Sequence, residues 1–159
     1  MIAGLSGTYG VSATIQPLTK AYVVEHLPAI LAIAADIPGE YWAEEHFLRE
    51  VPDKWNLSLV AIFYEQPIAY AVASRVGPTT AHLHHLMVAK AYRRHGVGSR
   101  LLSMMMDHMR QQGYTVVTAK VPIVFSWGDF TEFFYIGRGF VVTGIDHRGH
   151  GHFLLQAAL

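Results

Sequence analysis

The sequence contains no cysteine among its 159 residues. Disulfide bonds, thiolate zinc sites and a cysteine nucleophile are therefore excluded. The chain also lacks a run of about 18 apolar residues and a basic, apolar leader at its N-terminus, so we expect no membrane span and no secretion signal. These absences favour a cytoplasmic protein.

Net charge is absent as well. Twelve basic and twelve acidic side chains give a formal net charge of +0 at pH 7, with the ten histidines counted as neutral. No overall positive field is available to hold nucleic acid or an anionic membrane, so any anion site has to be local. A chain with so little net charge can self-associate, and a homodimer is one expectation.

The composition that remains is that of a folded domain. Apolar residues make up 52% of the chain and charged residues only 15%, which excludes a disordered protein. The length suits one domain spanning residues 1–159. Three of the first ten residues are glycines, so we expect residues 1–11 to form a flexible arm.

Hydrophobic periodicity predicts an α/β fold with about seven strands in a mixed sheet and about four helices. The segments 57–64 and 67–74 have the spacing of a β-hairpin, and strands 81–88 and 115–121 flank a helix, which predicts that these two strands are parallel. The predicted strands are residues 12–16, 57–64, 67–74, 81–88, 115–121, 140–145 and 153–157, and the predicted helices are residues 18–37, 44–50, 98–113 and 129–136.

The segment YRRHGVGSRLL, residues 92–102, lies between a predicted strand and a predicted helix. Its glycines, Gly96 and Gly98, allow a tight turn and a close approach of the backbone to a ligand, and the first amides of the helix point outward at its positive end. Three arginines supply local positive charge, which suits a pyrophosphate; they are Arg93, Arg94 and Arg100. The alternative is a plain tight turn with solvated arginines.

Two nucleotide-binding motifs are excluded in this segment. A dinucleotide fingerprint requires a third glycine where Leu101 stands, and a P-loop requires Gly-Lys-Ser/Thr at the end of the loop. The pattern Arg-x-x-Gly-x-Gly, formed by Arg93, Gly96 and Gly98 after the strand HLHHLMV, instead resembles motif A of the GNAT superfamily of acyl-CoA-dependent N-acyltransferases.

This resemblance implies the GNAT fold, acetyl-CoA as the acyl donor and no metal. It also implies a cofactor site. Backbone amides of the loop would hold the coenzyme A pyrophosphate, and the end of the preceding strand would pair with the pantetheine arm. The loop residues are Arg94, His95, Gly96, Val97, Gly98 and Ser99, and the strand residues are Leu86, Met87 and Val88.

A second element, FFYIGRGF at residues 133–140, resembles the family's Tyr-x-x-x-Gly-Phe sequence. It implies that Tyr135 donates a proton to the leaving thiolate, as a phenol with an ordinary pKa near 10 can do. The alternative is a tyrosine that only packs in the core. Family members often have Asn and Ala seven and four residues earlier, where this chain has Gly128 and Thr131, so Gly128 would border the cofactor without a side-chain contact.

Three histidines occur within four residues of the strand AHLHHLMV. Alternation along a strand puts His82 and His84 on one face and His85 on the other. His82 and His84 could accept the proton of the amine, directly or through water, and the His-Leu-His pair is similar to that of the serotonin (arylalkylamine) N-acetyltransferase family. Ordinary strand histidines remain the alternative, as do three glutamates as bases, which are Glu40, Glu44 and Glu45.

An acceptor pocket is expected at Tyr41 and Trp42, because aromatic walls suit an apolar or aromatic amine. Trp127 and Phe130 could face them. The expected acceptor is a small-molecule primary amine, and the alternatives are a protein N-terminus or lysine, or a module that binds acyl-CoA without catalysis. The segment DHRGHGH, residues 146–152, is interpreted as a turn rather than a metal site.

Overall fold

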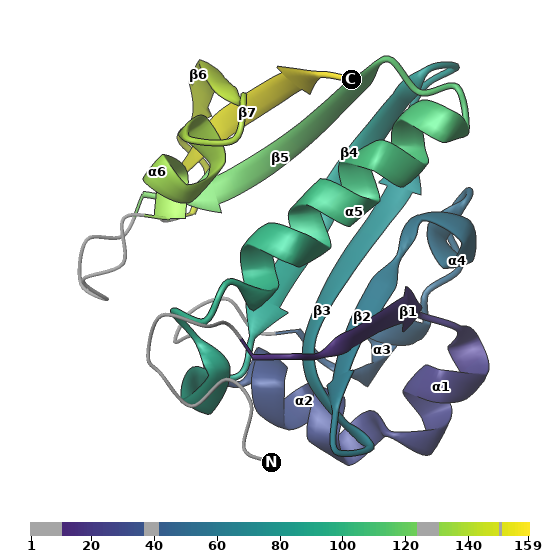
Figure 1. The fold of residues 1–159 in the computed structure, drawn as a ribbon. Helices are drawn as coiled ribbons and strands as arrows, with labels where there is room; N and C mark the ends of the chain where they lie inside the picture. Colours follow the sequence, from purple (N-terminus) through teal and green to yellow (C-terminus); the bar gives the residue numbers. More distant parts are fainter. Residues whose placement is uncertain (1–10, 37–41, 124–130, 150) are drawn as a thin grey trace.

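In the computed structural model, described for residues 11–36, 42–123, 131–149 and 151–159, the strands form one seven-stranded sheet in the order β1-β2-β3-β4-β5-β7-β6 (Figure 1). This confirms the mixed α/β fold. The strands are β1 (Thr14–Pro17), β2 (Leu59–Phe63), β3 (Gln66–Arg75), β4 (Thr80–Val88), β5 (Val116–Pro122), β6 (Val141–Asp146) and β7 (His152–Ala158).

β4 and β5 are parallel neighbours, as expected, whereas the other pairs in the sheet are antiparallel. Their pairing runs from Thr80 opposite Val116 to Leu83 opposite Ala119 and stops there, although both strands continue. Figure 1 shows the two strands separating beyond this point. The second half of β4 therefore has a free edge toward β5.

β4 also contains a β-bulge. Val72 of β3 pairs with His85, but the next residue, Ala73, pairs with Leu83, so His84 is an extra residue on β4. Because side chains alternate along a strand, one extra residue moves every later side chain to the opposite face from the one that a regular count predicts.

Helix α5 (Val97–Gln111) covers one face of the sheet, lying across β3 and β4 in Figure 1. Its apolar residues recur at helical spacing and are buried, as expected for an amphipathic helix. Together with inward side chains of the strands they form the larger part of the core; the buried residues of the helix are Val97, Leu101, Leu102, Met105, Met106 and Met109.

The opposite face is covered by α1 (Lys20–Glu25), α2 (Leu27–Ala34) and α3 (Glu44–Leu48), whose buried side chains pack with Val60, Tyr70, Val72 and Met87. The single helix expected over residues 18–37 is wrong. Pro28, at the start of α2, has no N–H to donate to the preceding turn, so the helix breaks at His26.

Two further short α-helices, α4 (Lys54–Leu57) and α6 (Thr131–Ile136), and the 3-10 helix η1 (Lys90–Tyr92) complete the described chain. α4 was not predicted, and it takes Leu57, which the sequence pattern assigned to a strand. The described part of the chain thus has six α-helices where about four were expected. In that part no helix has the length and apolar character needed to cross a membrane.

Candidate active site

The loop before α5 has the backbone geometry of an anion cradle. Gly96 is the N-cap of the helix with φ of 80°, and Arg94 also has a positive φ, of 66°. A Cβ added at Gly96 would meet nothing within 4 Å, so the backbone is open to an approaching ligand at this residue. The positive end of a 15-residue helix therefore begins at an open glycine, two residues after Arg94.

Gly98 serves packing. A Cβ there would lie 3.4 Å from Val88 Cγ2 and 3.6 Å from Phe134 Cζ, which shows how closely the first turn of α5 approaches β4 and α6. Arg138 strengthens this contact, because it donates to Ser99 Oγ and, over 2.7 Å, to the carbonyl of Phe134. The end of α6 is thereby tied to the anion cradle.

Arg93 is tied to the protein itself. Its Nε donates to the carbonyl of Val88 over 2.9 Å, and its Nη2 pairs with Asp36 Oδ2 at 3.0 Å. Arg93 thus fixes the end of β4 to the loop and to the segment after α2. Arg94, whose side chain is exposed, is not tied in this way.

His82 and His84 lie where β4 and β5 separate. His82 is opposite Thr118, one residue before the last paired position, and His84 is the first residue beyond that position. Each imidazole forms a hydrogen bond with a hydroxyl group. His82 Nδ1 lies 2.7 Å from Thr118 Oγ1, and His84 Nε2 lies 2.6 Å from Ser74 Oγ. The two rings meet edge to face with centroids 4.7 Å apart, so the expected pair on one face exists.

Both imidazoles are held in their neutral form. Burial lowers the pKa of His82 to about 4, with His84 and Lys120 acting in the same direction, and burial also lowers the pKa of His84, helped by Lys54 and Arg49. The hydroxyl partners carry no charge that would favour an imidazolium. Near pH 7 each ring can therefore accept a proton but holds it weakly.

These buried histidines predict acid destabilisation. The unfolded chain binds protons near pH 6.5, whereas His82 and His85 in the folded chain bind them near pH 4, so the free energy of unfolding falls as the pH drops through this window. One pKa unit corresponds to about 1.4 kcal/mol, and after discounting for partial solvent access we expect a loss of about 3 kcal/mol between pH 7 and pH 4.5.

Denaturant titrations at the two pH values would measure this loss. The double variant His82→Asn, His85→Asn should show a weaker dependence on pH, while His108→Asn, which changes a histidine of α5, should behave as the parent. An unchanged dependence in the double variant would mean that other groups cause the acid sensitivity.

The expectation for His85 is wrong. The bulge at His84 turns His85 to the face that carries α1–α3, where its ring is 7% exposed, stacks on Trp42 and lies 2.7 Å from the hydroxyl of Tyr70 through Nδ1. All three histidines therefore share one face of the sheet. Trp42, the expected acceptor wall, is half-buried and directly adjoins this row of rings.

Tyr135 is buried in the core, with 6% of its surface exposed, and its ring meets Phe134 and Phe140 edge to face. Burial raises the pKa of its phenol, so the hydroxyl stays protonated near neutral pH and has a proton to donate. Within the described residues the hydroxyl makes no hydrogen bond to the protein.

Several expected residues lie outside the described residues. They are Tyr41 and Gly128, together with Glu40, Trp127 and Phe130. Glu44 and Glu45, the other candidate bases, are exposed in the first turn of α3. At the end of β6, Asp146 pairs with Lys120 and Arg148, and the described residues contain no group of three or more side chains suited to a metal.

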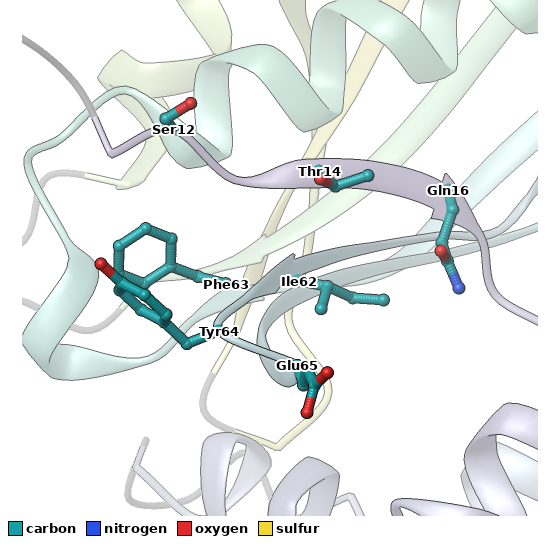
Figure 2. Close-up of a pocket in the computed structure, with 7 residues that line it drawn as sticks. All are labelled: Ser12, Thr14, Gln16, Ile62, Phe63, Tyr64 and Glu65. Carbon is teal, nitrogen blue, oxygen red and sulfur yellow. The ribbon is translucent and has the colours of Figure 1, made fainter.

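A pocket of about 540 Å³ lies elsewhere, along β1 and the β2–β3 hairpin (Figure 2). Its lining contains hydroxyls, aromatic rings and the carboxylate of Glu65 but no basic side chain, so it does not suit a phosphate. None of its residues belongs to β4, β5 or the loop before α5. The lining residues are Ser12, Thr14, Gln16, Ile62, Phe63, Tyr64 and Glu65.

Four contributors to the site were not predicted: Ser74, Thr118, Tyr70 and Arg138. The first three act through cross-strand partners, and their positions depend on the bulge and on where β4 and β5 separate. Arg138 had a signal in the sequence, because it is the basic residue between Tyr135 and Gly139 in the motif that suggested Tyr135.

Comparisons with known structures find the same fold. Ard1 from Thermoplasma volcanium has a TM-score of 0.81 and 21% identity, with 94% of this chain and 99% of that chain covered. The ribosomal-protein-S18-alanine N-acetyltransferase from Escherichia coli has a TM-score of 0.76 and 20% identity, with 92% and 93% covered.

Naa50 from Arabidopsis thaliana, in complex with the bisubstrate analogue CoA-Ac-MVNAL, has a TM-score of 0.73 and 14% identity, with 94% of this chain and 100% of that chain covered. A search of curated protein sequences found no match. The model of the acetyltransferase (GNAT) family matches residues 27–140, which include β4, the anion cradle and Tyr135. The chain therefore belongs to the GNAT family of acetyltransferases and is an acetyl-CoA-dependent N-acetyltransferase.

Proposed function

We propose that this enzyme acetylates a primary amine carried by a small apolar or aromatic molecule. The observation that supports the proposal best is the neutral pair His82 and His84 at the point where β4 and β5 separate. Trp42, which stacks on the neighbouring His85, offers an apolar surface to the acceptor on the same face of the sheet. Among the described residues no carboxylate acts on the pKa of either histidine. The acceptor's ammonium group therefore has no ion-pair partner beside the two histidines, and a neutral amine suits this site better.

The residues of the chain fit coenzyme A. The open space at Gly96, the first amides of α5 and the side chain of Arg94 suit its pyrophosphate, and the free edge of Leu86 to Val88 suits the amides of the pantetheine arm. When bound there, acetyl-CoA supplies an activated acetyl carbonyl. Arg93 would hold the end of β4 in place for this contact.

The amine must lose a proton before it can react, because an ammonium has no lone pair. In the proposed reaction His84, with His82, takes this proton, and the nitrogen lone pair forms a bond with the carbonyl carbon of the thioester. The nitrogen then loses its second proton to solvent, the carbon–sulfur bond breaks, and the thiolate leaves with the electron pair. Tyr135 gives the thiolate its proton, and solvent restores the proton of Tyr135.

The variant Tyr135→Phe tests whether Tyr135 is the proton donor. We expect kcat to fall about 10- to 100-fold, because general acid catalysis of this kind contributes roughly that much or more. The affinity for coenzyme A and the melting temperature should change little, since the ring packing is kept and the hydroxyl has no partner among the described residues. Steady-state thiol release, calorimetry and thermal melting would measure the three quantities. A parent-like kcat would make Tyr135 a core residue only.

A second candidate acceptor is the N-terminal amine of a peptide. It is favoured by the structural neighbours, since the E. coli protein acts on an alanine of ribosomal protein S18 and Naa50 was bound to an analogue that carries the peptide MVNAL. Both candidates use the same donor and the same chemistry, and they differ in the space that the acceptor needs.

Thiol release from acetyl-CoA would separate the candidates in one panel that contains 2-phenylethylamine, n-butylamine and the peptide MVNAL. We expect 2-phenylethylamine to have a kcat/KM at least about 10-fold above that of the peptide, because Trp42 can cover its ring. Turnover of the peptide alone would establish the second candidate. Binding of acetyl-CoA without turnover of any amine would indicate a module that binds but does not catalyse.

A further inference from the structure

Four rings form a closed cluster on the sheet face that carries His82 and His84. Trp42 meets Phe47 edge to face at 5.1 Å, Phe47 meets Tyr70 edge to face at 5.1 Å, Tyr70 lies 5.6 Å from His85, and His85 stacks on Trp42 at 4.7 Å. We call these four residues the aromatic cluster. It connects the segment before α3 to α3, β3 and β4, so a ring in it cannot move without its neighbours.

His85 is the unusual member of the aromatic cluster. Phe47 and Tyr70 are fully buried and His85 is 7% exposed, a setting in which an apolar ring would pack without any desolvation cost. The imidazole is compensated by one contact, the 2.7 Å hydrogen bond between Nδ1 and the hydroxyl of Tyr70. Burial raises the pKa of Tyr70, so the phenol keeps its proton, and the tautomer of His85 decides whether the hydroxyl or Nδ1 is the donor.

This hydrogen bond satisfies the buried imidazole, and the ring of His85 supports Trp42 by stacking beneath it. The indole lies nearly parallel to the imidazole, with an interplanar angle of 6°. Its other contacts are the edge of Phe47 and the tilted ring of His46, both from α3. One face of the indole therefore packs on His85 of β4, and Phe47 and His46 of α3 contact it as well, while part of its surface remains exposed.

The bulge in β4 puts the aromatic cluster on the same face of the sheet as His84. Because His84 is the extra residue of β4, His84 and His85 are consecutive residues whose rings lie on one face. One binds Ser74 and the other binds Tyr70, so they point to different partners along β3. The indole that stacks on His85 thus lies on the same face of the sheet as the imidazole that we propose as the base.

We propose that His85 is a positioning residue, which holds Trp42 as the fixed wall that places an apolar or aromatic acceptor amine next to His84. The inference rests on the proposed function. His85 itself makes no bond to the acceptor in this account, and it acts through the orientation of the indole. Loss of the ring beneath Trp42 should therefore weaken acceptor binding while the chemical step at saturation is kept.

Two variants separate the positioning role from a loss of folding. His85→Asn keeps an acceptor for the hydroxyl of Tyr70 but removes the ring beneath Trp42. The double variant Tyr70→Phe, His85→Phe removes both buried polar groups together and keeps two rings of similar shape, so it leaves no unsatisfied hydroxyl. We expect the double variant to behave as the parent and His85→Asn to differ.

The first measurement follows the indole N–H signals of the three tryptophans by NMR, on the full chain without ligands. The signal of Trp42, identified by its absence in Trp42→Phe, should shift and broaden in His85→Asn and stay sharp in the double variant. The signal of Trp55, whose indole donates to Glu50 Oε2 over 2.8 Å, is the internal control. An unchanged Trp42 signal in His85→Asn would overturn the inference.

The second measurement uses the amine of the panel that has the highest kcat/KM. His85→Asn should raise KM for this amine about 10-fold, with kcat within about two-fold of the parent and an unchanged Kd for coenzyme A, and the double variant should restore KM. An unchanged KM, or a loss confined to kcat, would contradict the positioning role. If the parent acetylates no amine, the proposed function fails. The NMR result still shows whether His85 holds Trp42 in place.

Discussion

Gly96→Trp is expected to weaken coenzyme A binding by at least about 100-fold, which corresponds to about 2.7 kcal/mol. The backbone at Gly96 has φ of 80°, and an added side chain would project into space that contains no protein atom within 4 Å of the Cβ. That space lies in front of the first amides of α5, where we place the pyrophosphate. The indole would therefore compete with the ligand rather than with the protein core.

The chain offers a matched control for this variant. Gly113, just after α5, has φ of 89° and an equally open Cβ position, so Gly113→Trp imposes a similar backbone strain of about 1 to 2 kcal/mol far from the cradle. Calorimetric titration of the parent and both variants with coenzyme A would decide. Equal affinities in all three proteins would remove the cofactor from this loop, and equal losses in both variants would point to strain instead of a blocked site.

The turn before α5 and the helix itself could be predicted from the sequence because their determinants are local. Two glycines, three arginines and an amphipathic helix follow one another within 20 residues, and the stripe of Leu101, Leu102, Met105 and Met109 is buried as its spacing predicts. Periodicity of this kind depends only on neighbours along the chain. The break between α1 and α2 had an equally local signal in Pro28, which the apolar periodicity of residues 18–37 obscured.

The arrangement of the histidines could not be predicted in the same way. Alternation along β4 correctly pairs His82 with His84, but the extra residue in the strand reverses the face of His85. A bulge depends on how β3 and β4 pair, so it is a property of two strands and not of one sequence window. The partners Ser74, Thr118 and Tyr70 follow from the same register, which explains why the sequence indicated the candidate bases but not the hydroxyls that hold them.

The second large effect is expected for the double variant His82→Ala, His84→Ala, in which kcat should fall about 100-fold or more, the usual contribution of a general base. In the parent, an imidazole accepts a proton only while it is neutral, so kcat should be lost as the pH falls through the lowered pKa values of the pair. For His82 this value is about 4, and burial also puts that of His84 below 6.5. The acidic limb of kcat therefore belongs below pH 6.5.

The affinity for coenzyme A should survive this change, since neither histidine borders the anion cradle, and His108→Ala on α5 should keep the parent's kcat and its acidic limb. A pH–rate profile of kcat for the three proteins, with the best amine of the panel, would test both statements. If the double variant keeps the parent's rate and limb, the proton leaves by another route. Glu44 and Glu45, exposed at the start of α3 two and three residues after Trp42, would then be the bases to test next.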